Sequence, residues 1–220
     1  MVKGFVMDDE RLKNPDGRPD YFDELLERIR EIRASEKRFY QKVRELFALS
    51  SDYDKSDKAT QMFFAETQNK LLYAVTRQTA AEIIVSRADA GKPNMALTSW
   101  KGSVVRKGDI YTAKNYLTKD EIDTLNRLVV IFLETAELRA KNRLEITISF
   151  WRQNVDGILT FNERPLLPGK GSISNEAMEQ KVNEIYALFN QKRKTHEAQQ
   201  ADAQDLEELK QLEEKLKRKS

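Results

Sequence analysis

The sequence is poor in the residues that most often carry chemistry or interrupt helices. Its 220 residues include no cysteine, one histidine, eight glycines and five prolines. The lack of cysteine excludes disulfides, thiolate catalysis and cysteine-ligated metal sites, and it fits a reducing compartment. The only histidine, His196, lies in a polar stretch where no core holds an imidazole in position. We therefore expect a solvated side chain without a catalytic or metal-binding role.

Long apolar runs are also missing. The longest, residues 128–133, is followed at once by Glu134 and is far shorter than the roughly 18 residues that a membrane span needs. The first residues, MVKGFVMDDERLK, contain no apolar core of the length that a signal peptide requires. We therefore expect a cytoplasmic protein that makes no contact with a membrane.

Neither sign of charge is in large excess. The chain has 38 basic and 36 acidic residues, a net charge of +2, so nucleic-acid binding would need a local basic patch. Charged residues make up 34% of the chain, above the globular norm of roughly 25%, which favours long solvated helices. Hydrophobic residues make up 40%, enough for a buried core in a chain of this length.

Sequence motifs for common enzymatic chemistries are absent. No dinucleotide fingerprint, P-loop, nucleophile elbow or zincin motif occurs. Acidic clusters at residues 8–10 and at Asp52, Asp54 and Asp57 lie at the N-terminus and in a polar turn, where Asp is expected for capping and solvation. We therefore predict no enzymatic activity, no cofactor and no metal site.

One enzymatic alternative stays open. A metal-dependent nuclease or toxin would have to use Asp89, Lys92, Asp109 and Lys114, which share the most irregular segment of the chain. Such an enzyme needs carboxylates that converge on rigid elements. No strand scaffold clearly supports these four residues.

Three stretches free of glycine and proline, residues 20–90, 109–156 and 172–220, predict most of the helices. In the first, apolar residues three and four apart predict one long helix from Phe22 to Phe47. A second helix should carry Phe63 to Val75, and a third, short one should open at Thr79. The apolar residues of the long helix are Phe22, Leu25, Leu26, Ile29, Ile32, Phe39, Val43, Leu46 and Phe47.

The second stretch has the clearest helical pattern, preceded by a capping box of Thr118 and Glu121. Its apolar residues are Ile122, Leu125, Val129, Phe132 and Ala136. A shorter helix is predicted from Trp151 to Asn162. In the third stretch the helical spacing resumes at Met178, Val182, Ile185 and Phe189.

The C-terminal end of the third stretch changes composition after Asn190. No large apolar residue follows until a stripe of four leucines, Leu206, Leu209, Leu212 and Leu216. Such a helix has nothing of its own to pack on, so it frays, stays solvated, or pairs with a partner as a coiled coil. Pairing normally needs three or four heptads, and barely two are present. Both outcomes remain open.

The segment from residue 79 to 116 breaks the helical pattern and is rich in cations. Residues 104–105 and 109–111 permit a small hairpin or an irregular loop, and residues 143–148 permit a strand or a helix start. Lysine and arginine beside an aromatic residue are the usual basis of nucleic-acid affinity. The alternative is a solvated loop whose Trp100 and Tyr116 tuck into the core. The candidate residues for binding nucleic acid or a partner are Arg87, Lys92, Asn94, Trp100, Lys101, Arg106, Lys107, Lys114 and Asn115.

Five phrases spread over residues 2–165 form a distinctive set: VKGFVMDDERLKNP, YFDELLERIREIRASEKRFYQKVRELFALSSDYD, FFAETQNKLLYAV, TAAEIIVSRADAGKPNMALTSWKG and AKNYLTKDEIDTLNRLV. In these phrases the chain resembles the virulence protein RhuM family of bacterial pathogenicity islands and mobile elements. The resemblance implies a longer protein with an N-terminal region similar to DNA-binding regulators, of which this chain corresponds to the C-terminal part. It implies no enzymatic reaction and no catalytic residues.

Together these observations predict an all-α, elongated domain of about six or seven helices. It should contain one irregular insertion at about residues 90–109 and a long projecting C-terminal helix. Residues 1–165 should form the helical domain. Residues 166–220 should form the C-terminal helix, packed at about 174–190 and then solvated or paired. The predicted function is a non-enzymatic interaction module with a homo-oligomeric or other protein partner, within a DNA-associated regulator of a mobile element. Direct nucleic-acid binding through residues 87–114 is the alternative.

Overall fold

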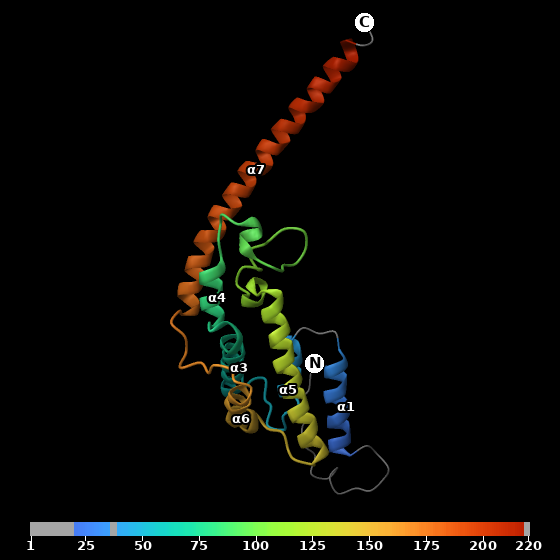
Figure 1. Ribbon diagram of the computed structural model, residues 1–220, viewed down its shortest axis with the longest axis vertical. Coiled ribbons are helices and arrows are strands. Elements are labelled where there is room, and N and C mark those ends of the chain that lie inside the picture. The colour runs from blue at the N-terminus through green and yellow to red at the C-terminus, as the bar shows by residue number, and fades with distance from the viewer. Residues whose placement is uncertain (1–19, 36–38, 218–220) are drawn as a thin grey trace. The chain divides into compact units, whose positions relative to one another are not determined.

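The computed structural model describes residues 20–35 and 39–217, excepting the side chains of residues 39, 40, 206 and 209–217. All regular structure in these residues is helical, with seven α-helices and two short 3-10 helices (Figure 1). The all-α prediction is therefore confirmed. Residues 104–111 and 143–148 form no strand. The hairpin alternative for the first range and the strand alternative for the second are therefore wrong. The acidic cluster at residues 8–10 lies outside the described residues.

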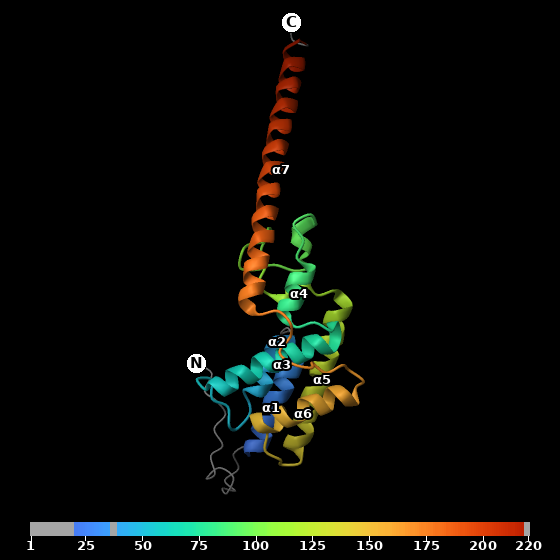
Figure 2. The same cartoon turned by 90° about the vertical axis from the view of Figure 1, so that its left-hand side faces the viewer.

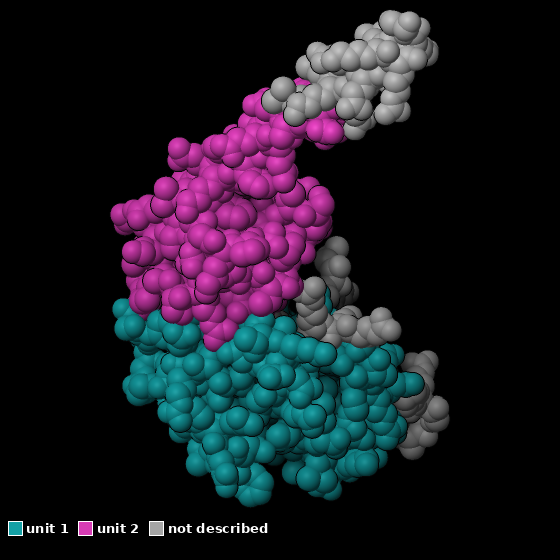
Figure 3. Space-filling view, turned by 45° about the horizontal axis from the view of Figure 1, so that its top comes forward, with its two compact units in different colours: residues 1–83, 117–172 teal, residues 84–116, 173–220 magenta. Residues whose placement is uncertain are grey.

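The chain folds into two compact units, each built from separated segments (Figure 3). Unit 1 contains residues 1–83 and 117–172, and unit 2 contains residues 84–116 and 173–220. The irregular segment and the C-terminal helix thus belong to the same unit. The domain boundary predicted near residue 165 stays a prediction.

The first predicted helix is two helices. Helix α1 spans Tyr21–Ala34 and α2 spans Phe39–Phe47, so the prediction of one continuous helix was wrong. Ser35 ends α1 with an extended backbone, ψ 148°, while its hydroxyl donates to the Ile32 carbonyl at 2.8 Å. Serine competes for backbone groups in this way and so favours helix ends. The three- and four-residue spacing of apolar residues does not reveal this helix end, because α1 and α2 each carry an apolar face with that spacing.

Three longer helices complete most of unit 1, and each begins at a side-chain cap. Helix α3 spans Lys58–Thr76 with Asp57 as its cap, and α6 spans Ile148–Phe161 with Thr147. Helix α5, Lys119–Lys141, begins with the predicted capping box of Thr118 and Glu121. Helices α1 and α5 pack together, and α3 and α6 run across them (Figures 1 and 2).

Aromatic rings fill the centre of unit 1. Phe47 is fully buried, and its ring lies 5.2 Å from that of Phe63, 5.1 Å from Trp151 and 6.3 Å from Phe132. These four residues come from α2, α3, α5 and α6. One cluster therefore holds four helices together, and burial of such large side chains is a main source of stability.

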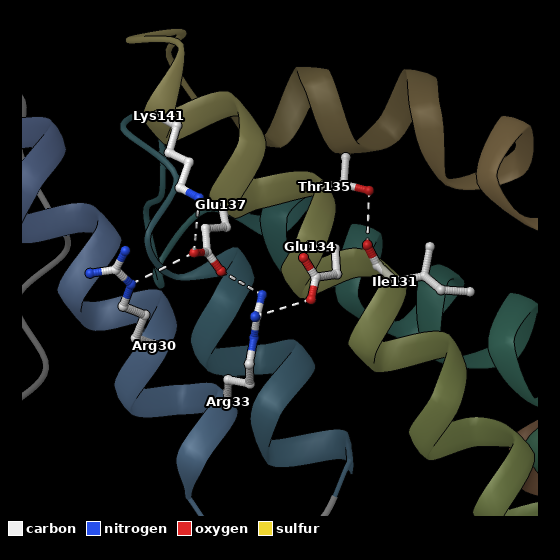
Figure 4. A network of polar contacts seen from close by, with 7 residues as sticks. All are labelled: Arg30, Arg33, Ile131, Glu134, Thr135, Glu137 and Lys141. Carbon is white, nitrogen blue, oxygen red and sulfur yellow. Dashed lines mark hydrogen bonds and ion pairs between the residues drawn. The ribbon is translucent and has the colours of Figure 1, made fainter.

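A polar network fixes α1 against α5 (Figure 4). The Glu137 carboxylate, with a side chain only 12% exposed, forms an ion pair with Arg33, whose Nη2 lies 2.6 Å away, and Arg30 and Lys141 lie at 3.6 and 3.8 Å. Arg33 also reaches Glu134 at 3.0 Å. A buried carboxylate needs such partners. The cluster therefore joins α1 to α5 through ion pairs.

Hydrogen bonds on Glu82 tie the start of α4, Ala80–Arg87, to the segment before α7. Glu82 accepts from the Thr79 amide at 2.7 Å, and from the amide and hydroxyl of Ser172 at 2.7 and 2.6 Å. Burial would raise the pKa of Glu82, but these bonds outweigh it and lower the pKa to about 2. Glu82 is therefore held as a carboxylate.

Unit 2 combines the second half of α4, the irregular segment and α7, Asn175–Lys217. Its buried side chains come from all three parts: Ile84, Met95, Leu97, Val105, Ile110, Tyr116, Met178 and Val182. The Tyr111 hydroxyl also donates to Asn183 Oδ1 of α7 at 2.6 Å. The first turns of α7 thus pack within their unit, and the long C-terminal helix is confirmed. Among the described residues, no helix is both long enough and apolar enough to cross a membrane.

Candidate functional site

Residues 88–116 of unit 2 exchange the α-helix for a series of tight turns. The 3-10 helix η2, Pro93–Ala96, contains three consecutive left-handed residues with φ of 52°, 57° and 62°, at Asn94, Met95 and Ala96. Left-handed backbone costs a non-glycine residue about 1–2 kcal/mol. Two features hold it here: Met95 is fully buried, and its amide donates to the Lys92 carbonyl at 3.1 Å. A second 3-10 helix, η3, spans Ala113–Tyr116.

Asn115 fastens the two ends of this segment together. Its carbonyl accepts from the Thr98 amide at 2.7 Å, its Oδ1 accepts from the Ser99 hydroxyl at 3.3 Å, and its Nδ2 donates to the Asp109 carbonyl at 2.9 Å. Asn115 is only 6% exposed, so these bonds are shielded from water. We call this set of bonds the Asn115 clasp.

Arg87 and Tyr116 extend the clasp toward α4. Arg87 Nη1 donates to the Tyr116 carbonyl at 2.9 Å, and the Tyr116 hydroxyl donates to the Ile110 carbonyl at 3.0 Å. Burial raises the pKa of the Tyr116 phenol well above its ordinary value. Two of the nine predicted binding residues, Arg87 and Asn115, are therefore engaged within the segment itself.

Asp109 closes a smaller loop at residues 101–106, which we call the basic loop. One carboxylate oxygen accepts from the Lys101 amide at 3.3 Å and the other from the Arg106 amide at 2.9 Å. Val105 anchors the loop in the core at 2% exposure, and Gly102 supplies a turn with φ of 85°. The sequence did not indicate this role for Asp109, because the bonds depend on the folded path of the loop.

The exposed cations of the segment lie on and beside the basic loop. Lys92, Lys101, Arg106 and Lys107 are exposed, and none forms an ion pair with a carboxylate of the described chain. The remaining predicted residues, Asn94, Trp100 and Lys114, are half-buried. Four of the nine candidates therefore present charge to solvent, which suits the binding of an anion.

The two carboxylates of the nuclease alternative, Asp89 and Asp109, accept hydrogen bonds from backbone amides. Asp89 Oδ1 accepts from the Gly91 amide at 2.8 Å, and both oxygens of Asp109 hold the basic loop. Over residues 20–35 and 39–217, no group of three or more acidic or histidine side chains has a geometry that would hold a metal ion. Asp89 and Asp109 thus act as turn-forming residues.

A second surface lies on α7, where sequence reasoning had indicated only the leucines. Leu188 is 54% exposed, and every described side chain from Lys194 to Asp205 is exposed. A shallow groove runs along one side of the helix and is lined by Leu188, Gln191, Lys192, Thr195, His196 and Gln199. Leu188 lies whole heptads before Leu209 and Leu216, and this spacing in the sequence was the signal that could have identified it.

Comparison with known proteins gives one match. The model described as the virulence protein RhuM family matches residues 1–197, which include all of unit 1 and the part of unit 2 up to residue 197. No curated protein and no solved structure matches the chain.

Proposed function

We propose that this chain, which belongs to the virulence protein RhuM family, is a non-enzymatic interaction module that self-associates through the second half of α7. One observation carries the proposal. The backbone of α7 is helical to Lys217, yet every described side chain from Lys194 to Asp205 is exposed. That half of the helix has no described packing partner within its own chain.

The physical argument is one of helix stability. Isolated helices shorter than about 12–15 residues are marginal in water, and most helices in proteins depend on packing of an apolar face. The second half of α7 is highly polar, and its sequence supplies large apolar residues only at the leucines from Leu206 to Leu216. Pairing between copies would bury such a stripe and stabilise the helix.

The remaining features support a role without catalysis. Asp89 and Asp109 are engaged by backbone amides, and His196 is exposed on α7. A general acid or base needs a held position and a partner, which an exposed helical side chain lacks. We propose that the module serves a DNA-associated regulator of a mobile element or pathogenicity island, the role that the resemblance implies.

Self-association is tested by sedimentation velocity on the full chain and on a variant carrying Leu209→Glu and Leu216→Glu. We expect a dimer for the full chain at tens of micromolar, and a monomer for the variant. Gln211→Glu is the matched control, because it adds charge two residues from Leu209, on a different side of the helix. Full chain and variant sedimenting alike as monomers would contradict the proposal.

Direct nucleic-acid binding is the second candidate function. The observation that favours it is the basic loop, whose shape is fixed by Asp109 while Lys101 and Arg106 within the loop and Lys107 beside it stay exposed. A pre-shaped cationic loop loses little conformational entropy when it meets phosphates.

Fluorescence anisotropy with duplex and single-stranded DNA at two salt concentrations tests this second candidate. Affinity should fall steeply with salt, with a slope close to 0.9 per phosphate contact for duplex. Lys101→Glu with Lys107→Glu should weaken binding and flatten that slope. Lys170→Glu, an exposed lysine of unit 1, should not. Absence of binding at low salt would reject direct contact.

A further inference from the structure

A single heptad register joins the exposed Leu188 to the leucines near the C-terminus. Leu209 and Leu216 lie three and four heptads after Leu188, and Leu206 lies three residues before Leu209. Alternating steps of four and three define the seam of a coiled coil. We call these positions the α7 seam; in order they are Leu188, Lys192, Thr195, Gln199, Asp202, Leu206 and Leu209.

The described half of the seam is open. Leu188 is 54% exposed although it follows the packed turns of α7, and Lys192, Thr195, Gln199 and Asp202 are all exposed. The shallow groove on α7 is lined by the first four seam residues, up to Gln199, and by Gln191 and His196 beside them. The face that a partner helix would cover is therefore accessible at the described seam positions from Leu188 to Asp202.

The charges within the seam distinguish the possible arrangements of two copies. In a parallel pair each residue meets its own counterpart, so Lys192 would face Lys192 and Asp202 would face Asp202. Like charges placed opposite each other are destabilising. An antiparallel pair brings different seam positions together and can avoid both repulsions.

We infer that two copies pair antiparallel through the α7 seam, with Lys192 of each opposite Asp202 of the other. This inference rests on the proposed self-association. In the same register Leu188 lies opposite Leu206, and Thr195 lies opposite Gln199. Every layer then matches apolar with apolar, cation with anion, or polar with polar. A polar or charged pair in a seam typically fixes register and orientation.

Neighbouring antiparallel registers lose this match. A shift by one heptad in one direction sets Lys192 against Leu209, and the opposite shift sets Asp202 against Ile185. Each leaves a charge against an apolar side chain, which is costly to bury. The seam of this chain is thus self-complementary in one antiparallel register, which points to a second copy as the partner.

Charge reversal tests the pairing by sedimentation equilibrium. Lys192→Asp alone and Asp202→Lys alone should each weaken dimerisation at least about tenfold, because each places like charges opposite each other. The double variant should recover the affinity of the natural chain to within about threefold. In a parallel pair each single reversal exchanges one repulsion for another. Unchanged affinity in both single variants would therefore overturn the inference.

Cysteine crosslinking gives an independent answer, because the natural chain has no cysteine. Leu188→Cys and Leu206→Cys chains should crosslink when mixed and oxidised, and neither should crosslink efficiently alone. Crosslinking of each variant with itself, or a persistent dimer without any crosslink, would overturn the antiparallel register and leave self-association standing. A natural chain that is monomeric throughout would instead reject the proposed function.

Discussion

The Asn115 clasp and the second half of α7 are both polar, and they obtain their shapes in opposite ways. In the clasp, Asn115 forms specific hydrogen bonds with the Thr98 amide, the Ser99 hydroxyl and the Asp109 carbonyl, and its side chain is buried. In α7, the described side chains from Lys194 to Asp205 are exposed, and their helix rests on local backbone bonds. The comparison teaches that one surface is shaped by contacts within the chain, whereas the other lacks such contacts among its described side chains and, in our proposal, gains them by association.

The largest expected effect comes from a proline in α7. Ala201→Pro removes a helical hydrogen bond and should cost the helix about 3 kcal/mol or more. We expect dimerisation to be lost, while the thermal midpoint at low protein concentration stays unchanged, because the clasp and the core of unit 1 do not depend on this part of the helix. Circular dichroism with sedimentation measures both. A lowered midpoint in the monomer would show that the second half of α7 does support its own chain.

Replacing an amide side chain in each region sharpens the contrast. Asn115→Ala should lower the free energy of unfolding by about 1–3 kcal/mol, because it leaves buried partners unsatisfied. Gln199→Ala, at an exposed position of α7, should change it by no more than about 0.5 kcal/mol in the monomer. Chemical denaturation below the dimerisation range gives both values. An equal loss of unfolding free energy in the two variants would mean that the hydrogen bonds of Asn115 do not stabilise the fold more than an exposed amide side chain does.

Acid should weaken the hydrogen bonds that Glu82 accepts from Thr79 and Ser172. The pKa of Glu82 falls from 4.5 to about 2 on folding, so its contribution is complete above pH 4.5 and is lost as the pH drops toward 2. Glu82→Gln should therefore cost about 1–2 kcal/mol at neutral pH and little at pH 2. Denaturation of both proteins across this range should show the two curves converging. A constant gap would contradict the assigned pKa.

The smallest change in unfolding free energy is expected for the exposed lysines, which both regions contain. Lys101→Glu in the basic loop and Lys194→Glu in α7 should each alter the free energy of unfolding by no more than about 0.5 kcal/mol. Denaturant titration measures both. A loss well above this for Lys101→Glu would mean that the lysine side chain helps to shape the loop, and would weaken its use as a free binding residue.

How far the sequence predicts each region depends on how local its interactions are. The stripe from Leu125 to Ala136 and the capping box of Thr118 and Glu121 depend on neighbours within one helix, and both were predicted. The end of α1 at Ser35 was missed, because the apolar spacing continues across it. The Asn115 clasp was missed because Thr98 and Asn115 lie 17 residues apart, and only the folded path brings them together.

The candidate site was predicted in part for the same reason. A cation-rich segment can be read from composition, and Lys92, Lys101, Arg106 and Lys107 are indeed exposed. Composition does not indicate that Arg87 donates to the Tyr116 carbonyl or that Asp109 closes the loop. The apolar pattern alone does not connect Leu188 to the leucine stripe, because the heptad positions between Leu188 and Leu206 hold polar or charged residues.

The molar mass of the full chain in solution tests the central claim most directly. Light scattering coupled to size exclusion at tens of micromolar should give twice the 25.6 kDa of one chain, and the mass should fall toward 25.6 kDa on dilution. A mass of 25.6 kDa at every concentration would contradict self-association through α7 and leave the exposed residues 194–205 of that helix without the role proposed for them.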